Sequence, residues 1–368
     1  MNRTGHLPAL EGLRGYAAFL VYLVHAFGLL AAQLNGLDAD RHLVWTDHGV
    51  NRALLVFIFR SHYGVDLFFV LSGLFMADLA VRRWPGTTAF LRQRWLRIYP
   101  AYFVSVVVVA LLSWLWFGQT FSTGEFLGNL VLWQGFFILD IAAVNPVTWS
   151  LSYEAVFYLA VPALALLWRT RGQPGTATLS AASLIIIAVA AAIPVDKVIY
   201  LAYFALFVPG VTLGLMTNEH RQALSRRLPL WVVIGAWAAF TLAFKLEVIA
   251  NTGPTYYVVS SVACGLVVLK ACDAEGMLAR TLASPILGWL GRYSYSFFLI
   301  HYAVVQCWGA WLADRLPAVR LGYSLAFLAG SLATSLVAAR LLWAGAERVY
   351  FHRAKPGVRG SGDGALRA

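Results

Sequence analysis

The sequence predicts an all-α polytopic membrane protein with about ten transmembrane helices. Hydrophobic residues make up 60% of the 368 residues and charged residues only 12%, about half the charged share of an ordinary soluble domain. Mean hydropathy is +0.70. Apolar segments of about twenty residues recur along the chain, and a helix of that length crosses the hydrocarbon core of a bilayer. The lipid bilayer is therefore the first expected partner.

Ten segments are long and apolar enough to be predicted as spanning helices. They are 13–32, 64–81, 99–117, 150–168, 179–194, 198–216, 228–245, 255–271, 290–312 and 321–343. The first apolar stretch is too long for the apolar region of a signal peptide, so no cleavable signal is expected.

One further apolar stretch, 126–144, decides the topology. Counting it as a span would place Arg169 and Arg171 outside and invert every later connection. Treating it as a re-entrant or interfacial segment leaves ten spans, cytoplasmic N and C termini, and most of the 28 Lys and Arg residues on the inner side. This asymmetry orients bacterial membrane proteins. The net charge of +11 is then a topology signal, and no nucleic-acid partner is expected.

The chain divides into one transmembrane domain, 1–350, and a tail, 351–368, that we expect to be cytoplasmic and without fixed structure. Two outer connections, 33–62 and 118–148, are longer than ordinary loops and are expected to be functional. Gly210 and Gly214 form a GxxxG pattern on an apolar segment, which predicts close helix packing.

No metal site is expected. The histidine and aspartate residues of the first outer connection match no spacing of metal ligands, so a solvated loop is the simpler interpretation. They are Asp38, Asp40, His42, Asp47 and His48. The three cysteines lie in or beside apolar segments at unrelated spacings, as expected of thiols that pack between helices.

Arg14 and His25 stand out in the first predicted span. Eleven helical steps bring their side chains to nearly the same azimuth, roughly 16 Å apart along the axis. Ionisable groups inside hydrocarbon are costly, so a functional role is the default interpretation for His25. The spacing suggests the two ends of one extended ligand.

Five more ionisable residues lie at or within predicted spans: Asp66, Arg94, Arg97, Glu154 and His301. Each has a structural alternative. The arginines fit positive-inside anchors, the acids fit partners of helix dipoles, and the histidine fits a hydrogen-bonding residue between helices.

Taken together, the charged groups suggest a path across the membrane. Arginines at the inner rim suit a phosphate-bearing cytosolic ligand. A neutral histidine part-way across can accept the proton of a hydroxyl. Carboxylates toward the outer side, Asp66 and Glu154, would orient that ring or bind a hydroxylated acceptor. We expect donor and acceptor to meet at His25.

The sequence blocks around these residues resemble the acyltransferase 3 family of membrane acyltransferases. An R-x10-H motif, GVDLFFVLSG, an R-x-x-R motif, WSLSYE and YSYSFFLIH occur in that family's order, between about residues 7 and 350. The resemblance implies that His25 is catalytic, that Arg14 is its required partner, and that the R-x-x-R arginines serve the acyl donor. It also implies a conserved polar set in the pore: Asp66, Glu154 and His301.

The chain departs from the family pattern in three respects. Glu11 stands where the family usually has aspartate, and Phe298 stands where a tyrosine is common. We also expect no outer hydrolase-like domain of the kind that receives the acyl group in some relatives. Transfer is then expected to go directly to the acceptor or through a separate acyl-receiving protein.

The resulting hypothesis is a membrane O-acyltransferase of the bacterial inner membrane. It would move an acyl group, expected to be acetyl, from cytosolic acyl-CoA to a hydroxyl of a carbohydrate or another hydroxylated acceptor, without a metal. His25 would act as general base or as acyl carrier, and both routes stay open. Trp149, Ser152 and His301 are expected to contact the acceptor, although Trp149 also fits an interfacial anchor.

A proton-coupled secondary transporter is the alternative. Ten spans and buried ionisable groups permit a proton relay through His25, Asp66 and Glu154. The two halves of the chain show no repeat, and the inner arginines suit a bound nucleotide better than a passing solute. The enzyme is therefore favoured.

Overall fold

The computed structural model describes residues 7–35, 63–193, 198–245, 253–313, 315 and 321–348, and every regular element within these ranges is a helix. The elements are α1 Pro8–Asn35, α3 Gly64–Arg82, α4 Thr87–Phe117, α5 Thr123–Leu130, η1 Phe137–Leu139, η2 Pro146–Thr148, α6 Trp149–Arg171, α7 Thr176–Ala192, η3 Val198–Leu206, α8 Phe207–Leu215, α9 Asn218–Arg227, α10 Leu230–Lys245, α11 Pro254–Ala271, α12 Met277–Leu282, α13 Pro285–Ala313, α14 Leu321–Leu342 and the π-helix η4 Trp343–Glu347.

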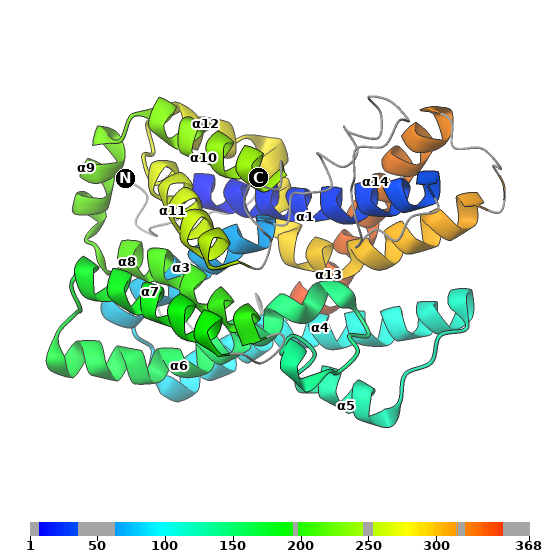
Figure 1. Ribbon diagram of the computed structural model, residues 1–368, viewed down its shortest axis with the longest axis horizontal. Coiled ribbons are helices and arrows are strands. Elements are labelled where there is room, and N and C mark those ends of the chain that lie inside the picture. The colour runs from blue at the N-terminus through cyan, green and yellow to red at the C-terminus, as the bar shows by residue number, and fades with distance from the viewer. Residues whose placement is uncertain are drawn as a thin grey trace, which may run out of the picture.

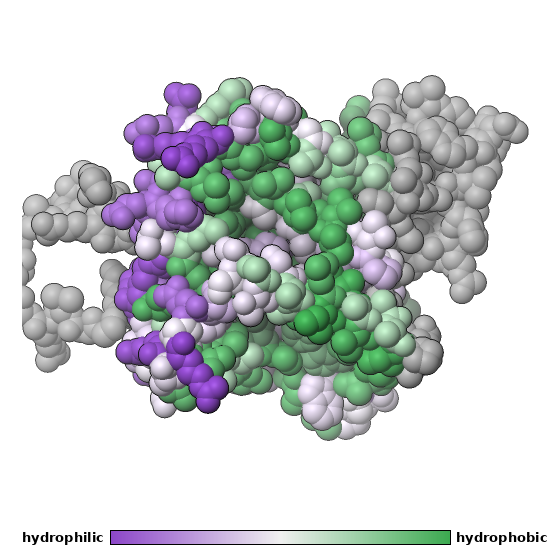
Figure 2. Space-filling model, turned by 60° about the vertical axis from the view of Figure 1, so that its left-hand side comes forward, coloured by the Kyte–Doolittle hydropathy of each residue, from purple (hydrophilic) through white to green (hydrophobic). Residues whose placement is uncertain are grey.

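The helices form a bundle with one strongly polar end. Helices α1, α4 and α6 run along the long axis of the molecule, and α9 lies across one end of it (Figure 1). The chain bends by 109° between the η3–α8 segment and α9. Figure 2 shows hydrophilic residues gathered at that end and apolar residues over most of the remaining face.

Large apolar side chains point outward from several helices. Leu159 on α6, Ile185 on α7 and Leu341 on α14 are 68%, 60% and 68% exposed. An outer surface of this kind would be unstable in water and is stable in lipid, where each helix satisfies its own backbone polar groups. The structure therefore confirms an all-α, polytopic membrane protein.

Helices occupy each of the ten predicted segments. By length and composition, six helices in the described ranges are able to cross a membrane, or seven if the bent pair is one span. Two further apolar helices, Thr176–Ala192 and Leu230–Phe244, are shorter. The count of ten spans and the cytoplasmic placement of both termini remain predictions.

The ambiguous stretch 126–144 does not form a spanning helix. It contains the end of α5, a turn and the single 3₁₀ turn η1. Ser122 caps α5 in a reciprocal capping box with Glu125, and hydrogen bonds from Ser122 lower the pKa of the Glu125 carboxyl. Trp133 is 55% exposed. These features fit a segment that lies at the surface of the bundle.

Glycines bring α3 and α8 into close contact. A Cβ atom at Gly210 would lie 1.8 Å from the carbonyl oxygen of Val70, and one at Gly214 would lie 2.5 Å from that of Leu74. Hydrogen at these positions lets the two backbones meet directly. The GxxxG pattern is thus a helix-packing motif, as the sequence predicted.

Helices α1 and α13 are parallel neighbours. A Cβ at Gly291 would lie 2.0 Å from the carbonyl oxygen of Glu11, and further along the same direction His25 meets His301. The packing of α1 against α13 places the first predicted span beside the YSYSFFLIH block. It therefore brings together the two histidines of the candidate site.

We predict that Gly210→Ala lowers the thermal stability of the purified protein. The added methyl group has no space against the Val70 carbonyl, and overpacking of this kind costs about 1–3 kcal/mol. The matched control is Gly235→Ala on α10, where a Cβ meets no atom within 4 Å and alanine favours the helix. Equal melting temperatures for the two variants in detergent would contradict the packing argument.

Several predicted features lie outside the described residues. They include most of the first outer connection, with Asp38, Asp40, His42, Asp47 and His48, and the tail 351–368.

Candidate active site

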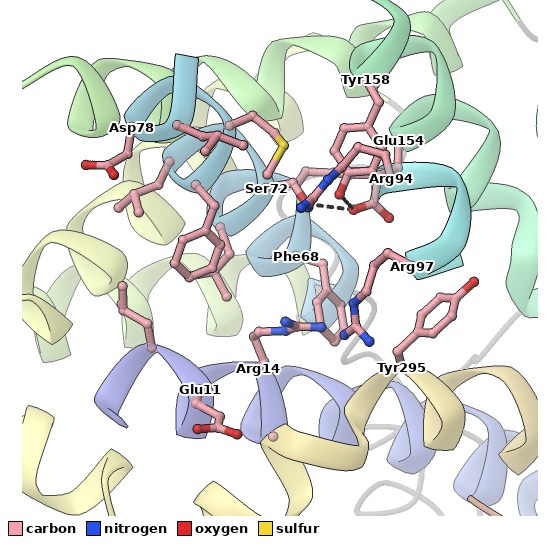
Figure 3. Close-up of a pocket in the computed structure, with 18 of the residues that line it drawn as sticks. Glu11, Arg14, Phe68, Ser72, Asp78, Arg94, Arg97, Glu154, Tyr158 and Tyr295 are labelled. Carbon is pink, nitrogen blue, oxygen red and sulfur yellow. Dashed lines mark hydrogen bonds between the residues drawn. The ribbon is translucent and has the colours of Figure 1, made fainter. Parts of the chain in front are cut away.

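A cavity of about 1180 Å³ opens among α1, α3, α4, α6 and α13, with residues of α9 and η4 also in its wall. Seven arginines and three carboxylates line it, so its field is strongly positive. The arginines are Arg14, Arg82, Arg83, Arg94, Arg97, Arg221 and Arg292, and the acids are Glu11, Asp78 and Glu154. Figure 3 shows Arg14, Arg94 and Arg97 pointing from α1 and α4 into this common space.

Arg14 and Arg94 keep their charge available to a ligand. Neither forms an ion pair with any described residue, and the buried Nε of Arg94 has no hydrogen-bond acceptor there. The Arg94 guanidinium lies 5.8 Å from the ring centres of Phe90 and Tyr158, which hold it in place. A buried donor that lacks a partner requires an explanation, and an anionic ligand provides one.

Arg97 is held differently, by a residue that the sequence did not indicate. Glu347 in the π-helix η4 forms an ion pair with Arg97 and accepts a 2.6 Å hydrogen bond from Ser296. Glu347 is 1% exposed, and the Arg97 guanidinium also lies 5.5 Å from the Tyr295 ring centre. Single π turns are common at functional sites. Much of the Arg97 charge is neutralised within the protein.

We predict that Arg97→Gln and Glu347→Gln each lower thermal stability more than the double variant does. Each single change leaves a buried charge without its partner, at a cost of about 3–5 kcal/mol, whereas the double variant leaves two neutral amides. Melting in detergent measures this. Arg226→Gln breaks the exposed Arg226–Glu275 pair and should have almost no effect. A raised donor KM with unchanged stability in Arg97→Gln would instead indicate direct donor binding.

Glu154 also lines the cavity, whereas its place in the sequence predicted a position toward the outer side of the membrane. Its Oε1 accepts a 2.8 Å hydrogen bond from Ser72 and a second one from Tyr158 (Figure 3). Tyr158 follows Glu154 by one helical turn, and Ser72 belongs to the GVDLFFVLSG block. Helical spacing could have suggested the tyrosine. Only the α3–α6 contact supplies the serine.

A second cluster of charged side chains stands at the polar end of the cavity. Asp78 accepts hydrogen bonds from Arg82 and Arg83 at 2.6 and 2.8 Å. Arg82 and Arg221 also donate to the last carbonyl groups of α8, those of Gly214 and Leu213. Cations at a helix C-terminus are favourable, so part of this cluster is structural. Its net positive charge still adds to the field in the cavity.

His25 and His301 form a hydrogen-bonded pair. The Nδ1 atom of His25 lies 3.0 Å from Nε2 of His301 and 3.0 Å from the carbonyl oxygen of Val21. The Nδ1 atom of His301 lies 3.0 Å from the carbonyl oxygen of Phe297. His301 is fully buried, and His25 is partly buried.

These contacts fix the tautomers of both rings. A carbonyl oxygen only accepts, so Nδ1 of His301 donates to Phe297 and, in the neutral ring, its Nε2 carries a lone pair. That lone pair accepts the Nδ1–H of His25. The proton on Nδ1 of His25 leaves a lone pair on its Nε2. His25 is thereby prepared to accept a proton or to attack a carbonyl carbon through Nε2.

Asp66 is separate from this pair. It is 1% exposed and accepts hydrogen bonds from Tyr256 and Ser260 of α11. From the sequence, we expected the carboxylates to orient the His25 ring or to bind a hydroxylated acceptor. The structure places His301 against Nδ1 of His25. The sequence contained no signal for the α3–α11 contact that binds Asp66.

Trp149 and Ser152 lie in the packed aromatic region of α6. The Trp149 ring packs 4.8 Å from the Tyr203 ring and 5.9 Å from the Phe137 ring, centre to centre. Ser152 is buried and accepts a 3.0 Å hydrogen bond from the backbone N–H of Gly135. Neither residue lines the arginine-rich cavity.

Within the described residues, no three histidine, cysteine, aspartate or glutamate side chains gather in a way that could hold a metal ion.

The fold and the site define a class of protein. It is a multi-pass membrane protein with a cavity lined by seven arginines and with a hydrogen-bonded histidine pair, His25 and His301, outside that lining. The chain belongs to the acyltransferase domain family, whose model (Acyl_transf_3) matches residues 7–340. It is therefore a membrane O-acyltransferase, and it is an enzyme.

Two relatives align with this chain over most of their own length. The chain is 26% identical to "Acyltransferase MdmB" of Streptomyces mycarofaciens over 372 residues, covering 93% of this chain and 90% of the relative. It is also 26% identical to "Nodulation protein 10" of Rhizobium leguminosarum bv. viciae over 382 residues, covering 92% of this chain and 98% of the relative. No solved structure matches the chain significantly.

Proposed function

We propose that the enzyme moves an acyl group, acetyl in the first instance, from acyl-CoA to a hydroxyl of a carbohydrate or another hydroxylated acceptor. The observation that carries this proposal is the Nδ1–H···Nε2 contact between His25 and His301, because it places the proton of the neutral His25 ring on Nδ1 and makes Nε2 its basic nitrogen. The arginine-lined cavity beside this pair supplies the donor side.

The cavity suits a long, anionic donor. A volume of about 1180 Å³ slightly exceeds the roughly 300–1,000 Å³ of ordinary small-molecule pockets. Guanidinium groups pair well with phosphate oxygens, so Arg14 and Arg94 would bind the phosphates of the donor. His25 lies about 16 Å further along α1 than Arg14. An extended arm would carry the thioester across that distance.

His25 would act through Nε2. In the direct route, Nε2 takes the hydroxyl proton while the acceptor oxygen attacks the thioester carbon, the carbon–sulfur bond breaks, and the thiolate leaves and takes up a proton. In the acyl-carrier route, Nε2 first attacks the same carbon, and the carbon–sulfur bond breaks with loss of the thiolate. The hydroxyl oxygen then attacks the acyl carbon, the carbon–nitrogen bond breaks, and the released Nε2 takes the hydroxyl proton and passes it to the thiolate. In both routes the Nδ1–H bond to His301 stabilises positive charge on the ring. No metal takes part in either route.

The two sides of the membrane would supply different substrates. We place the arginine-rich end in the cytosol of a bacterial cell and the enzyme in its inner membrane, because positive charge marks the cytoplasmic side. The acceptor would approach His25 from the opposite side. Transfer would go directly to the acceptor or through a separate acyl-receiving protein.

The test uses purified protein in detergent with radiolabelled acetyl-CoA and a panel of hydroxylated acceptors. We expect release of free thiol together with a labelled, ester-linked acceptor. Mass spectrometry of surface glycans from cells with and without the gene identifies the natural acceptor by a lost acetyl group. Solute uptake into proteoliposomes without consumption of the thioester would contradict the proposal and favour a transporter.

A further inference from the structure

Two phenylalanines in the wall of the cavity connect it to the histidine pair through ring contacts. Phe68 of α3 and Phe298 of α13 both line the cavity, and their rings meet edge to face at 6.0 Å. The Phe298 ring lies 6.2 Å from the ring of His301. Neither His25 nor His301 lines the cavity. In the view of Figure 3, the Phe68 side chain lies in the same region as those of Arg14 and Arg97.

The phenylalanine pair is built into the packed interior. Phe298 is 5% exposed, and Phe68 packs against both hydrophobic clusters of the bundle, one formed around α3 and the other around α1 and α13. Ser72 lies one helical turn beyond Phe68 on α3 and binds Glu154 in the cavity wall. The lining therefore changes from polar to aromatic where it approaches His301.

We propose that Phe68 and Phe298 form an acyl filter, a partition that the acyl thioester must pass to reach His25 and that admits only short acyl chains. This inference rests on the proposed function. The passage must open by a displacement of one ring, and each added methylene of the acyl chain requires a larger displacement. Packed interiors yield little to extra volume, so long chains are rejected.

The filter has a second consequence, the exclusion of water. Water that reaches a thioester beside a basic histidine would hydrolyse it: the water oxygen bonds to the carbonyl carbon, the carbon–sulfur bond breaks, and a carboxylic acid and a thiol result. Two apolar rings in edge-to-face contact, with Phe298 next to His301, keep this side reaction slow.

The experiment compares Phe68→Ala, Phe298→Ala and the milder Phe298→Leu with the unaltered enzyme. Acetyl-CoA, butyryl-CoA and hexanoyl-CoA are the donors, and kcat/KM is measured for each with the same acceptor. We expect the butyryl-to-acetyl ratio of kcat/KM to rise by about tenfold or more, the usual effect of methylene-sized changes in an apolar pocket. Release of thiol without acceptor should rise as well.

Phe117→Ala is the matched control, since Phe117 lies at the end of α4, is 48% exposed and is remote from the cavity lining. It should leave the chain-length ratio unchanged. Melting temperatures of all variants show whether they fold, and Phe298→Leu retains most of the side-chain volume if the alanine variants do not.

Unchanged donor ratios and unchanged acceptor-free thiol release in a folded Phe298 variant would overturn the acyl filter. An equal loss of activity with all three donors would overturn it too. The proposed function would be contradicted by a different result: the unaltered enzyme would consume no acyl-CoA.

Discussion

Replacement of His25 by alanine is expected to reduce acyl transfer by about 10²- to 10⁴-fold, the usual contribution of a general base. The reason is the loss of the basic Nε2 atom, the ring nitrogen that the Nδ1–H contact with His301 leaves unprotonated. Both proposed routes use this atom, so neither survives the change. Transfer of label from acetyl-CoA to the acceptor measures the effect at saturating donor, which separates it from weaker binding.

Variants of His301 test whether the hydrogen bond to Nδ1 of His25 supports catalysis. His301→Leu removes the acceptor for the Nδ1–H of His25 and should lower kcat, whereas His301→Gln offers an amide oxygen near the position of Nε2 and should restore part of the activity. His220→Ala on the exposed face of α9 is the histidine control and should behave like the unaltered enzyme. Full activity in folded His25→Ala would exclude both routes.

The second large effect is expected at Arg14 and Arg94, two cavity arginines that form no ion pair with any described residue. Arg14→Gln and Arg94→Gln should each raise the KM for acetyl-CoA by about 10- to 100-fold, because a hydrogen bond to a charged group contributes about 1.5–3 kcal/mol. Thermal stability should change little, since neither side chain forms an ion pair with the described part of the protein. Steady-state kinetics with varied donor measures the shift.

Arg92→Gln is the control for these two changes. Arg92 lies on α4 two residues before Arg94, is exposed and does not line the cavity. If Arg92→Gln raised KM as much as Arg94→Gln, general attraction between the basic end of the protein and an anionic donor would explain the result. A specific role of Arg94 in donor binding requires that Arg94→Gln raise the KM clearly more than Arg92→Gln does.

The sequence predicted the helices well because the bilayer imposes a simple rule. A span needs about twenty apolar residues, and each such segment became helical, including the short α7 and α10. The structure of the stretch 126–144 was harder to predict, because its composition fits a spanning helix while its chain contains turns that interrupt one. The structure shows α5 ending at Leu130 and a single 3₁₀ turn after it.

The candidate site was predicted in part. Arg14, Arg94, Arg97 and Glu154 were all identified from charge in or beside apolar segments, and the structure brings all four to one cavity. Asp66 was identified for the same reason, but it accepts a hydrogen bond from Tyr256 of α11 and does not line the cavity. Buried charge marks a position that must be satisfied, but the pattern does not say by which neighbour.

What the sequence alone determined is therefore local. The common face of Arg14 and His25 follows from 3.6 residues per turn, and the Tyr158–Glu154 contact follows from the same period. The tertiary structure decided which distant residues meet: His25 with His301 across 276 positions and Arg97 with Glu347 across 250. These pairs depend on how helices such as α1 and α13 pack through their glycines. Helical periodicity fixes the face on which a side chain lies, whereas its partner is fixed only by the neighbouring helix that packs against that face.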